Sequence, residues 1–182
     1  MRELLFVTGN ENKFREAQAI LGLKLARSDI EVQEMQDLNV RAVAESKVRD
    51  AFDKLGTPLF VEDAGLEIAA LNRFPGALQS WVSKTIGNQG ILKLLQGSDD
   101  RRAKAIACIA YHDGTRVRVF EGVTEGTISA EVKKGSGWDY DFIFIPDGDS
   151  RTFSEMSPEE KDKVSHRFKA LSKFAEWLRN PK

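Results

Sequence analysis

A strand that ends in two adjacent carboxylates constrains this chain more than any other feature of its sequence. The segment PLFVEDAGLEI places Glu62 and Asp63 directly after an apolar run and directly before Ala64 and Gly65. Burying two neighbouring carboxylates is costly unless a cation accompanies them. Magnesium prefers hard oxygen ligands and usually arrives together with substrate phosphates. The segment therefore predicts a magnesium site, and it directs attention to groups elsewhere in the chain that would hold phosphate.

The composition indicates one domain with no general attraction for polyanions. The 182 residues are 41% hydrophobic, which is enough for one sizeable core, so we predict a single domain over residues 1–182 with two lobes. Lys and Arg total 27 against 28 Asp and Glu, and a formal net charge of -1 gives no global affinity for nucleic acid or an anionic membrane. Any affinity for anions must therefore be local.

Cysteine usage and hydropathy indicate a cytoplasmic protein. The single cysteine, Cys108, lies in the apolar run AIACIAY, where we expect a core residue, and it cannot form an internal disulfide, which suits a reducing compartment. No stretch approaches the roughly 18 apolar residues of a membrane span, and the N-terminal sequence has no signal-peptide pattern. We therefore expect a cytoplasmic location and no membrane partner.

The first part of the chain alternates extended and helical segments. The apolar run at residues 4–7 predicts a strand, and helical spacing predicts a helix from Phe14 that ends at Gly22. We expect a second extended segment over residues 30–35 and a helix over residues 40–55, before the strand that carries the two carboxylates. This alternation predicts an α/β fold.

The later part of the chain predicts an antiparallel region followed by helix. Strand-like runs at residues 104–111, 117–124 and 127–132 are separated by turn residues, which indicates a hairpin or meander. A last strand is expected over residues 142–145, and helical sequence begins at residue 157 or 158. Together the segments predict a mixed sheet flanked by helices.

The segment TGNENK, residues 8–13, is a candidate phosphate loop. Small residues stand where a strand hands over to a helix, so backbone N–H groups and the helix dipole can face an anion, and Lys13 adds a full charge. The segment is not a Walker loop, because it lacks the GxxxxGK[ST] pattern. An ordinary Gly-Asn turn followed by a solvated lysine is the alternative.

Two carboxylates are candidates for metal binding or acid–base chemistry. Asp63, at a strand end beside a glycine, can bind metal and also orient or deprotonate a water molecule. Its alternative role is an Asx turn that caps the strand. Glu34, in QEMQD, would bring a third carboxylate to the same edge of the sheet, or it is simply exposed.

The segment GSGWDYDFIFIP, residues 135–146, is a candidate base-binding segment. Trp138 and Tyr140 stand beside Asp139 and Asp141, so an aromatic face can stack on a base while a carboxylate or an N–H group contacts its edge. The alternative is a hairpin whose aromatic side chains only pack on the core.

A cationic group opens or interrupts the final helical region. His166, Arg167 and Lys161 lie within about one turn of one another and suit phosphate or a purine carbonyl. The only other histidine, His112, lies in an expected turn, so a histidine metal cluster is not expected. The chain has no G-x-S-x-G segment, which disfavours a serine triad.

Four blocks of sequence together resemble one enzyme family. TGNENKFREA, VEDAGLEIAALNRFPG, GWDYDFIFIP and FSEMSPEEKDKVSHRFKAL, in this order, resemble the inosine triphosphate pyrophosphatase family, also called Ham1-like non-canonical purine NTP pyrophosphatases. The match spans nearly the whole chain. The resemblance implies an elongated mixed sheet with a cleft between two lobes and a homodimer. It also implies magnesium-dependent hydrolysis of ITP, dITP and XTP to the monophosphate and pyrophosphate, which removes deaminated purine nucleotides before polymerases use them.

The same resemblance assigns roles to individual residues. Asp63 corresponds to the catalytic acid/base and metal ligand, Glu34 is the choice for a second metal ligand, and Glu62 is a further candidate. The phosphate loop, a lysine facing the triphosphate, a stacking aromatic with an aromatic–aspartate pair, and the lysine and SHR motif make up the substrate site. The implied substrate-binding residues are Thr8, Gly9, Asn10, Lys13, Lys47, Ala64, Trp138, Asp139, Tyr140, Asp141, Lys161, His166 and Arg167.

Three positions depart from the family pattern, and two other functions stay open. Ala64 stands where Ser or Thr is common, Asp139 where Gly is usual and Phe142 where Pro is usual, which bears on the shape of the base pocket. A Maf-like pyrophosphatase for other modified nucleotides is one alternative, and the SHR and GWDYD segments argue against it. A nucleotide-binding module without turnover is another, and the carboxylate pair at residues 62–63 disfavours it.

Overall fold

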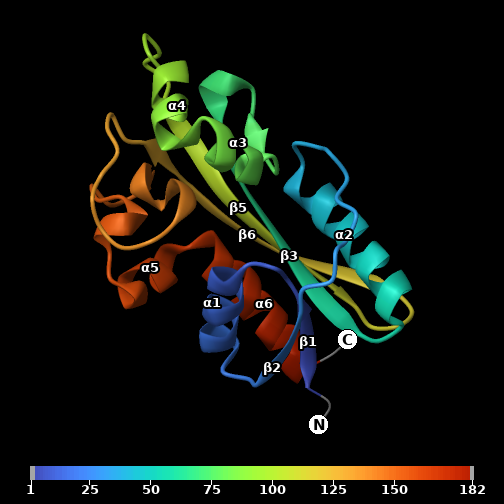
Figure 1. Ribbon diagram of the computed structural model, residues 1–182. Coiled ribbons are helices and arrows are strands. Elements are labelled where there is room, and N and C mark those ends of the chain that lie inside the picture. The colour runs from blue at the N-terminus through green and yellow to red at the C-terminus, as the bar shows by residue number, and fades with distance from the viewer. Residues whose placement is uncertain (1–2, 181–182) are drawn as a thin grey trace.

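The protein is built around one mixed β-sheet, seen in a computed structural model that describes residues 3–180 (Figure 1). The strand order is β2-β1-β3-β5-β6-β7, and β4 pairs with β3. Strand β1 runs parallel to β2 and β3, whereas the other pairs are antiparallel. The strands are β1 (Leu4–Val7), β2 (Leu25–Ser28), β3 (Leu59–Ile68), β4 (Pro75–Gly76), β5 (Arg102–His112), β6 (Val117–Ile128) and β7 (Phe144–Pro146). The helices are α1 (Glu11–Leu21), α2 (Val40–Leu55), α3 (Gln79–Thr85), α4 (Gly87–Leu94), α5 (Pro158–Val164) and α6 (His166–Arg179), with 3-10 turns η1 (Ala69–Leu71), η2 (Asp139–Phe142) and η3 (Phe153–Glu155).

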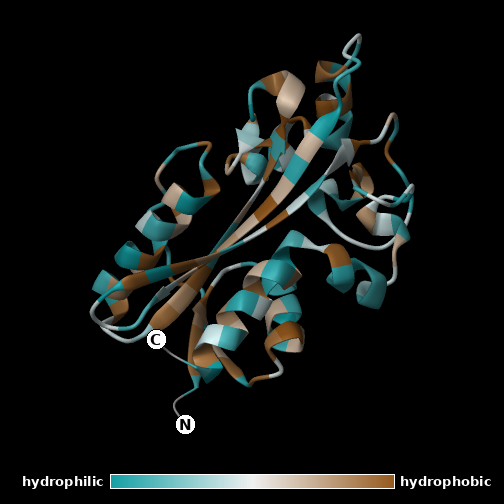
Figure 2. Cartoon of the chain, turned by 180° about the vertical axis from the view of Figure 1, so that it is seen from behind, coloured by the Kyte–Doolittle hydropathy of each residue, from teal (hydrophilic) through white to brown (hydrophobic). Residues whose placement is uncertain are grey.

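The long strands β3, β5 and β6 cross the whole molecule and carry helices on both faces (Figure 1). On one face, α1 and α6 pack on a core that includes Phe6, Phe60 and Phe174. On the other face, α2 packs on a core that includes Val48 and Val61. The brown, apolar stretches in Figure 2 follow the central strands, whereas the helices alternate brown and teal as amphipathic elements do. The mixed sheet flanked by helices is as predicted.

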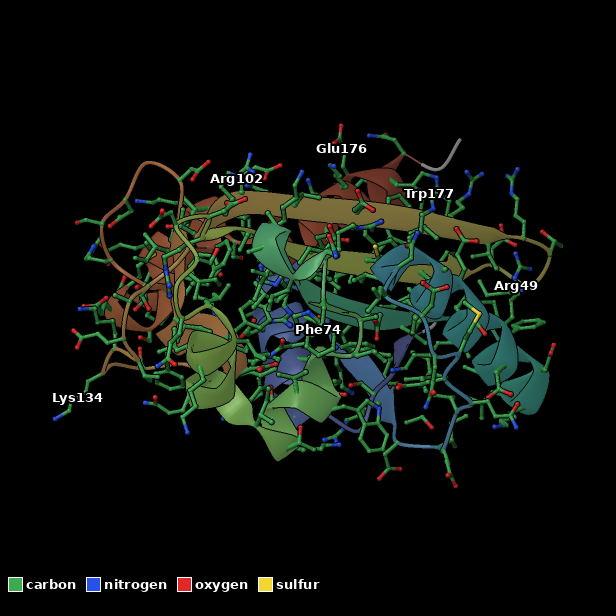
Figure 3. The ribbon with its side chains drawn as sticks, turned by 90° about the horizontal axis from the view of Figure 1, so that it is seen from above. Arg49, Phe74, Arg102, Lys134, Glu176 and Trp177 are labelled. Atoms are coloured by element: carbon green, nitrogen blue, oxygen red, sulfur yellow. The ribbon has the colours of Figure 1, made fainter. Side chains whose placement is uncertain are left out.

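A second lobe forms at the far end of the long strands. Helices α3 and α4, strand β7 and turn η3 enclose a separate core cluster that includes Leu66, Ile91 and Phe144. The connection from β6 to η2 runs along the edge of this lobe, where Lys134 projects away from the protein (Figure 3). A cavity lies between the two lobes, where the β1–α1 loop, η2 and α3 all contribute to its lining. Within residues 3–180, no helix is both long and apolar enough to cross a membrane.

Helices α1 and α2 begin at asparagine caps and end at glycines. Asn10 caps α1 by accepting the N–H groups of Asn12 and Lys13 at 2.9 and 3.1 Å, and Asn39 caps α2 in the same way. Both helices end at glycines in the left-handed conformation, as predicted. Asn10 also lies within the predicted phosphate loop at residues 8–13, so the same side chain orders part of that loop and the start of α1.

The second extended segment, predicted over residues 30–35, does not join the sheet. The strand beside β1 is β2 at residues 25–28, in register Leu4 with Leu25, and residues 29–38 form no regular element. Contacts to α2 hold this irregular segment, because the backbone N–H of Gln33 donates to Asp50 at 2.8 Å and Lys54 donates to the Glu31 carbonyl at 2.9 Å. The sequence pattern indicates an extended backbone, but it does not show that this segment contacts helix α2 and not a neighbouring strand.

Two further boundaries differ from the prediction. Strand β6 continues through Glu125 and Gly126, which pair with β5, so residues 127–132 are not a separate strand. The expected strand at 142–145 is shortened to β7, because residues 139–142 form η2. The final helical region is interrupted at the cationic group, which is one of the two predicted arrangements: Ser165 ends α5 and caps α6 by accepting the Phe168 N–H at 3.1 Å. Helices α3 and α4 formed no part of the prediction.

A glycine in β6 sets how closely α6 approaches the sheet. A Cβ atom on Gly122 would lie 2.5 Å from the backbone nitrogen of Ala170 and closer still to the backbone oxygen of His166. Backbone atoms cannot rotate away as a side chain would, so only glycine permits this contact. Gly122 therefore fixes the position of the first turn of α6, where His166 and Arg167 lie.

Replacing Gly122 by alanine is expected to lower the free energy of unfolding by about 1–3 kcal/mol, because the added methyl overpacks against fixed backbone. Urea denaturation at neutral pH measures the change. Glu125→Ala is the control, since this exposed residue lies on the same strand and its exposed pair with Lys104 contributes at most about 1 kcal/mol. Equal stability of Gly122→Ala and the native chain would contradict the close approach.

Candidate active site

The predicted functional residues meet in one cavity of about 250 Å³ between the lobes. The cavity takes its walls from the β1–α1 loop, β3, α3, η2 and the start of α6. Of the residues predicted to bind substrate, only Lys161 lies outside its lining, and the three candidate metal ligands lie inside it. The lining residues are Thr8, Gly9, Asn10, Lys13, Glu34, Lys47, Glu62, Asp63, Ala64, Ala77, Gln79, Ser80, Trp138, Asp139, Tyr140, Asp141, His166 and Arg167.

One end of the cavity is cationic. Lys13, on the first turn of α1, places its Nζ atom 3.4 Å from the Glu62 carbonyl and 3.6 Å from the Glu62 carboxylate. Lys47, on α2, forms an ion pair with Glu34, which lies on the irregular segment at residues 29–38. The cap at Asn10 orients the start of α1, whose dipole adds positive potential at this end. The predicted phosphate loop is therefore accompanied by two lysines from different helices.

A buried ion pair between Glu62 and Arg167 joins β3 to α6. The Arg167 Nε atom donates to both carboxylate oxygens at 3.0 and 3.1 Å, and Nη2 donates to Oε1 at 2.8 Å. Both side chains are almost completely buried. Burial opposes the charged guanidinium, but the carboxylates of Glu62 and Glu16 outweigh it and raise the pKa of Arg167. Arg167 thus donates to both carboxylate oxygens of Glu62, so in this structure the candidate metal ligand is paired with a guanidinium.

Asp63 differs from its neighbour because no side chain among residues 3–180 forms an ion pair with its carboxylate. The residue is 7% exposed, and its Oδ2 atom is buried with no hydrogen-bond partner among the described residues. Burial raises the pKa of Asp63 to about 6, while the charges of Lys13 and Lys47 act in the opposite direction. An unpaired, buried carboxylate oxygen facing a cavity indicates a place for a ligand.

The donor set fits magnesium in the form that accompanies a phosphate substrate. Within residues 3–180, no three His, Cys, Asp or Glu side chains are grouped so that they would hold a metal ion by themselves. Magnesium characteristically takes one or two carboxylates and completes its shell with water and substrate phosphate oxygens. The unpaired Asp63 oxygen and the Glu34 carboxylate supply hard oxygen donors at the lysine-rich end of the cavity.

The other end of the cavity is aromatic. The Arg167 guanidinium lies 4.9 Å from the Trp138 ring centroid, and the Trp138 indole N–H donates to Glu16 at 3.0 Å. Asp141 accepts the Trp138 backbone N–H at 3.1 Å and pairs with Lys161 at 2.7 Å. Lys161 therefore acts on Asp141, which explains its absence from the cavity lining.

Tyr140 and His166 form a buried pair behind the aromatic wall. The Tyr140 hydroxyl lies 2.9 Å from His166 Nε2 and donates to the Gly65 carbonyl at 3.5 Å. Burial and the charges of Arg167 and Lys161 lower the pKa of His166 well below its ordinary value, so the imidazole is neutral at pH 7. Its Nδ1 atom is buried without a hydrogen-bond partner in the described chain. The predicted position of His166 at the cavity is confirmed.

Two polar residues of the site escaped the sequence prediction. Glu16, one turn after Lys13 on α1, accepts from Arg167 Nη1 at 2.6 Å as well as from Trp138. Burial opposes its ionisation, but Arg167 and Lys161 outweigh burial and lower the pKa of Glu16. Its helical spacing from Lys13 was the available signal. Gln79 opens α3, and no residue before it suggested that this helix would line the cavity.

Comparisons with known proteins agree with this geometry. A model described as the Ham1 family matches residues 4–177. The chain belongs to the Ham1 family. It is 44% identical to a dITP/XTP pyrophosphatase of Methanopyrus kandleri over 98% of this chain and 97% of that protein. It is 42% identical to a dITP/XTP pyrophosphatase of Thermococcus kodakarensis over 97% of each chain. Among solved structures, a HAM1 protein from Coxiella burnetii is similar, with a TM-score of 0.86 and 31% identity over 98% of this chain and 99% of that one.

Glu16→Gln is expected to lower the free energy of unfolding at pH 7 by about 1.5–3 kcal/mol, because the Arg167 guanidinium loses a charged hydrogen-bond acceptor. Urea denaturation measures it. Since the folded-state pKa of Glu16 is lowered, its contribution is present above the ordinary value of 4.5 and is lost as the pH falls through the folded-state pKa. Native and variant stabilities should therefore converge in acid.

Asp162→Asn is the matched control for Glu16→Gln, because Asp162 is a nearby carboxylate on α5. Burial and repulsion by the Glu16 charge both raise the pKa of Asp162, so its ionised form is disfavoured. Neutralising it should leave stability unchanged or increase it slightly. A loss in Asp162→Asn as large as in Glu16→Gln would show that general charge balance, and not the contact with Arg167, produces the effect.

Proposed function

We propose that this Ham1-family chain hydrolyses non-canonical purine nucleoside triphosphates, namely dITP, ITP and XTP, to the monophosphate and pyrophosphate. One observation carries the proposal: the unpaired Asp63 carboxylate oxygen lies in a cavity with lysines at one end and Trp138 at the other. Relatives named dITP/XTP pyrophosphatase, 42% and 44% identical over nearly the whole chain, support the choice of substrate.

The cationic end suits the triphosphate. Release of pyrophosphate breaks the bond between the α-phosphorus and the oxygen that bridges to the β-phosphate, so negative charge develops on the leaving group. Lys13 and Lys47, together with the N–H groups of the phosphate loop, would stabilise that charge. This arrangement needs no covalent intermediate on the protein.

Asp63 suits the role of general base for the attacking water. A carboxyl group with a pKa of about 6 is mostly ionised at neutral pH and accepts a proton more readily than an ordinary aspartate. Burial supplies this property, and Lys13 and Lys47 keep the pKa from rising further. Asp63 therefore combines access to the cavity with a suitable basicity.

We propose magnesium as the cofactor, held by Asp63 and Glu34 together with phosphate oxygens of the substrate. When bound, the ion would offset phosphate charge and increase the acidity of a coordinated water. Glu34 forms an ion pair with Lys47 of α2, so an anionic and a cationic group would lie beside the same substrate. Glu62 would support the site through its ion pairs with Arg167 and Lys13.

The aromatic end suits the purine. Trp138 offers a ring for stacking, and Arg167 and Glu16 hold that ring in place. Hypoxanthine and xanthine carry a 6-oxo group where adenine has an amino group, so a donor such as the Arg167 guanidinium or a backbone N–H would favour the oxo form. The proposal also includes a homodimer in the cytoplasm that acts on free nucleotides and not on nucleic acid.

The proposed base can be tested by titration. In the metal-free protein, carbon-13 NMR of the Asp63 carboxyl should give a pKa of about 6. Lys47→Met should raise it, because a charge that stabilises the carboxylate is removed. Lys54→Met, on the same helix but paired with Asp50, should leave it unchanged. An Asp63 pKa near 4 in the native chain would contradict the assignment of a desolvated base.

Product analysis tests the function. With magnesium, the native chain should release pyrophosphate from dITP, ITP and XTP and little from GTP or ATP, and chelation by EDTA should abolish turnover. Asp63→Asn should lower kcat by a factor of about 10² to 10⁴ while the variant still binds dITP, as expected for loss of a general base. Asp53→Asn, an exposed aspartate of α2, is the control.

Three results of this assay would overturn the proposal. Release of orthophosphate would mean that a different phosphate bond is cleaved. Equal turnover of all purine triphosphates would remove the base selection. Full activity in Asp63→Asn would mean that another group activates the water.

A further inference from the structure

Gln79 is a buried polar residue of the cavity to which the proposed mechanism gives no role. It is 2% exposed and opens α3. Its amide nitrogen donates to the Asp139 carboxylate at 2.7 Å and to the Ser83 hydroxyl at 3.0 Å. Its amide oxygen, Oε1, is buried and has no hydrogen-bond partner among residues 3–180. The side chain is therefore fixed at one atom and unpaired at the other.

The chemistry of its neighbour fixes which way the amide points. Burial raises the pKa of Asp139, whereas the hydrogen bonds that its Oδ1 atom accepts from Ser83 and Gln79 favour the ionised form. An ionised carboxylate accepts hydrogen bonds and donates none, so the nitrogen of Gln79, and not the oxygen, faces Asp139. The amide oxygen is consequently turned away from Asp139. A buried carbonyl oxygen without a donor costs about 1–3 kcal/mol, and an orphan of this kind in a cavity wall indicates a ligand that donates a hydrogen bond.

The wall that carries Gln79 is rigid. Asp139 adopts a left-handed backbone conformation with φ of 59°, which is uncommon for a residue other than glycine. Gln79 and Ser83 of α3 both contact its carboxylate, and Asn88 of α4 donates to its carbonyl at 2.8 Å. Helices α3 and α4 thus hold η2 in a fixed position, and the Gln79 oxygen cannot turn to another partner without breaking these contacts.

The position of this wall identifies the part of a nucleotide that it would face. Asp139 directly follows Trp138 of the aromatic end, and Asp139 and Gln79 line the same cavity as Lys13 of the cationic end. We place Gln79 and Asp139 between the two ends, as the sugar of a nucleoside triphosphate lies between the base and the phosphates. The phosphates offer only acceptors at neutral pH, whereas the sugar offers hydroxyl donors.

We infer that Gln79 is a specificity-determining residue whose Oε1 atom accepts a hydrogen bond from the 3′-hydroxyl of the substrate sugar. The 3′-hydroxyl is chosen because it is the hydroxyl common to ribonucleotides and deoxyribonucleotides, and relatives are named for dITP as well as XTP. The inference rests on the proposed function. It extends that function by giving the sugar a recognition element on α3.

The test compares kcat/KM for dITP and for 2′,3′-dideoxyITP, which differ only in the 3′-hydroxyl. The native chain should prefer dITP by about tenfold, because the dideoxy substrate leaves a buried acceptor unpaired. Gln79→Met, which has a similar shape and no amide, should reduce this preference to near onefold. Ser83→Ala is the matched control, since it removes a contact to Asp139 but keeps the Gln79 oxygen, so the preference should persist.

The outcomes distinguish a failure of the Gln79 inference from a failure of the proposed function. Equal use of dITP and dideoxyITP by the native chain would overturn the inference without any variant, even if Gln79→Met failed to fold. An unchanged preference in active Gln79→Met, or an equal loss of preference in Ser83→Ala, would also overturn it. Absence of turnover of every purine triphosphate by the native chain would instead overturn the proposed function, and the inference with it.

Discussion

The buried ion pair of Glu62 and Arg167 is the interaction on which the site depends. It joins the central strand β3 to the first turn of α6, and through Glu16 it extends to α1. Desolvation of two charges is expensive, so removing one partner of such a pair typically costs about 3–5 kcal/mol. The pair is tolerable because the carboxylate accepts three hydrogen bonds from one planar guanidinium and Lys13 lies close by. Three elements that line the cavity are thereby held in one arrangement.

The two neighbouring carboxylates of β3 illustrate how environment separates their roles. Glu62 is surrounded by cations and acts as a structural anion. Asp63 receives only the more distant influence of Lys13 and Lys47, and burial dominates its pKa. Carboxylates whose surroundings differ in this way commonly divide structural and acid–base duties. The cost of leaving Asp63 unpaired is offset by the rigid frame around it, which is the usual relation between stability and a functional site.

Much of this arrangement could be predicted from the sequence, and the exceptions share a cause. The apolar run before Glu62, the cap at Asn10 and the glycine ends of α1 and α2 are local signals, and the structure confirms that a strand and two helices lie there. The predicted end of the strand at Glu62 and Asp63 is wrong, because pairing with β5 continues β3 to Ile68 and leaves the two carboxylates inside the strand. Failures occurred where a distant partner decides the outcome. Residues 30–35 have extended character but lie against α2, and β6 passes through Gly126 because β5 pairs with it there. Distant partners also shape the site: Lys161 pairs with Asp141 and lies outside the cavity lining, and Glu16 and Gln79 contact residues far away in sequence.

The irregular segment at residues 29–38 differs from the rest of the site in what holds it in place. Glu34 lies on a stretch that belongs to neither the sheet nor a helix, and side-chain contacts to α2, such as those of Asp50 and Lys54, tether it. Moving that stretch would leave the sheet ladder intact, but it would break its hydrogen bonds to α2 and withdraw Ile30 and Val32 from the core beneath α2. Such a local opening costs less than global unfolding. Asp63 and Glu34 are therefore held by different kinds of contact: the ladder of β3 fixes Asp63, whereas side-chain packing and a few hydrogen bonds position the segment that carries Glu34.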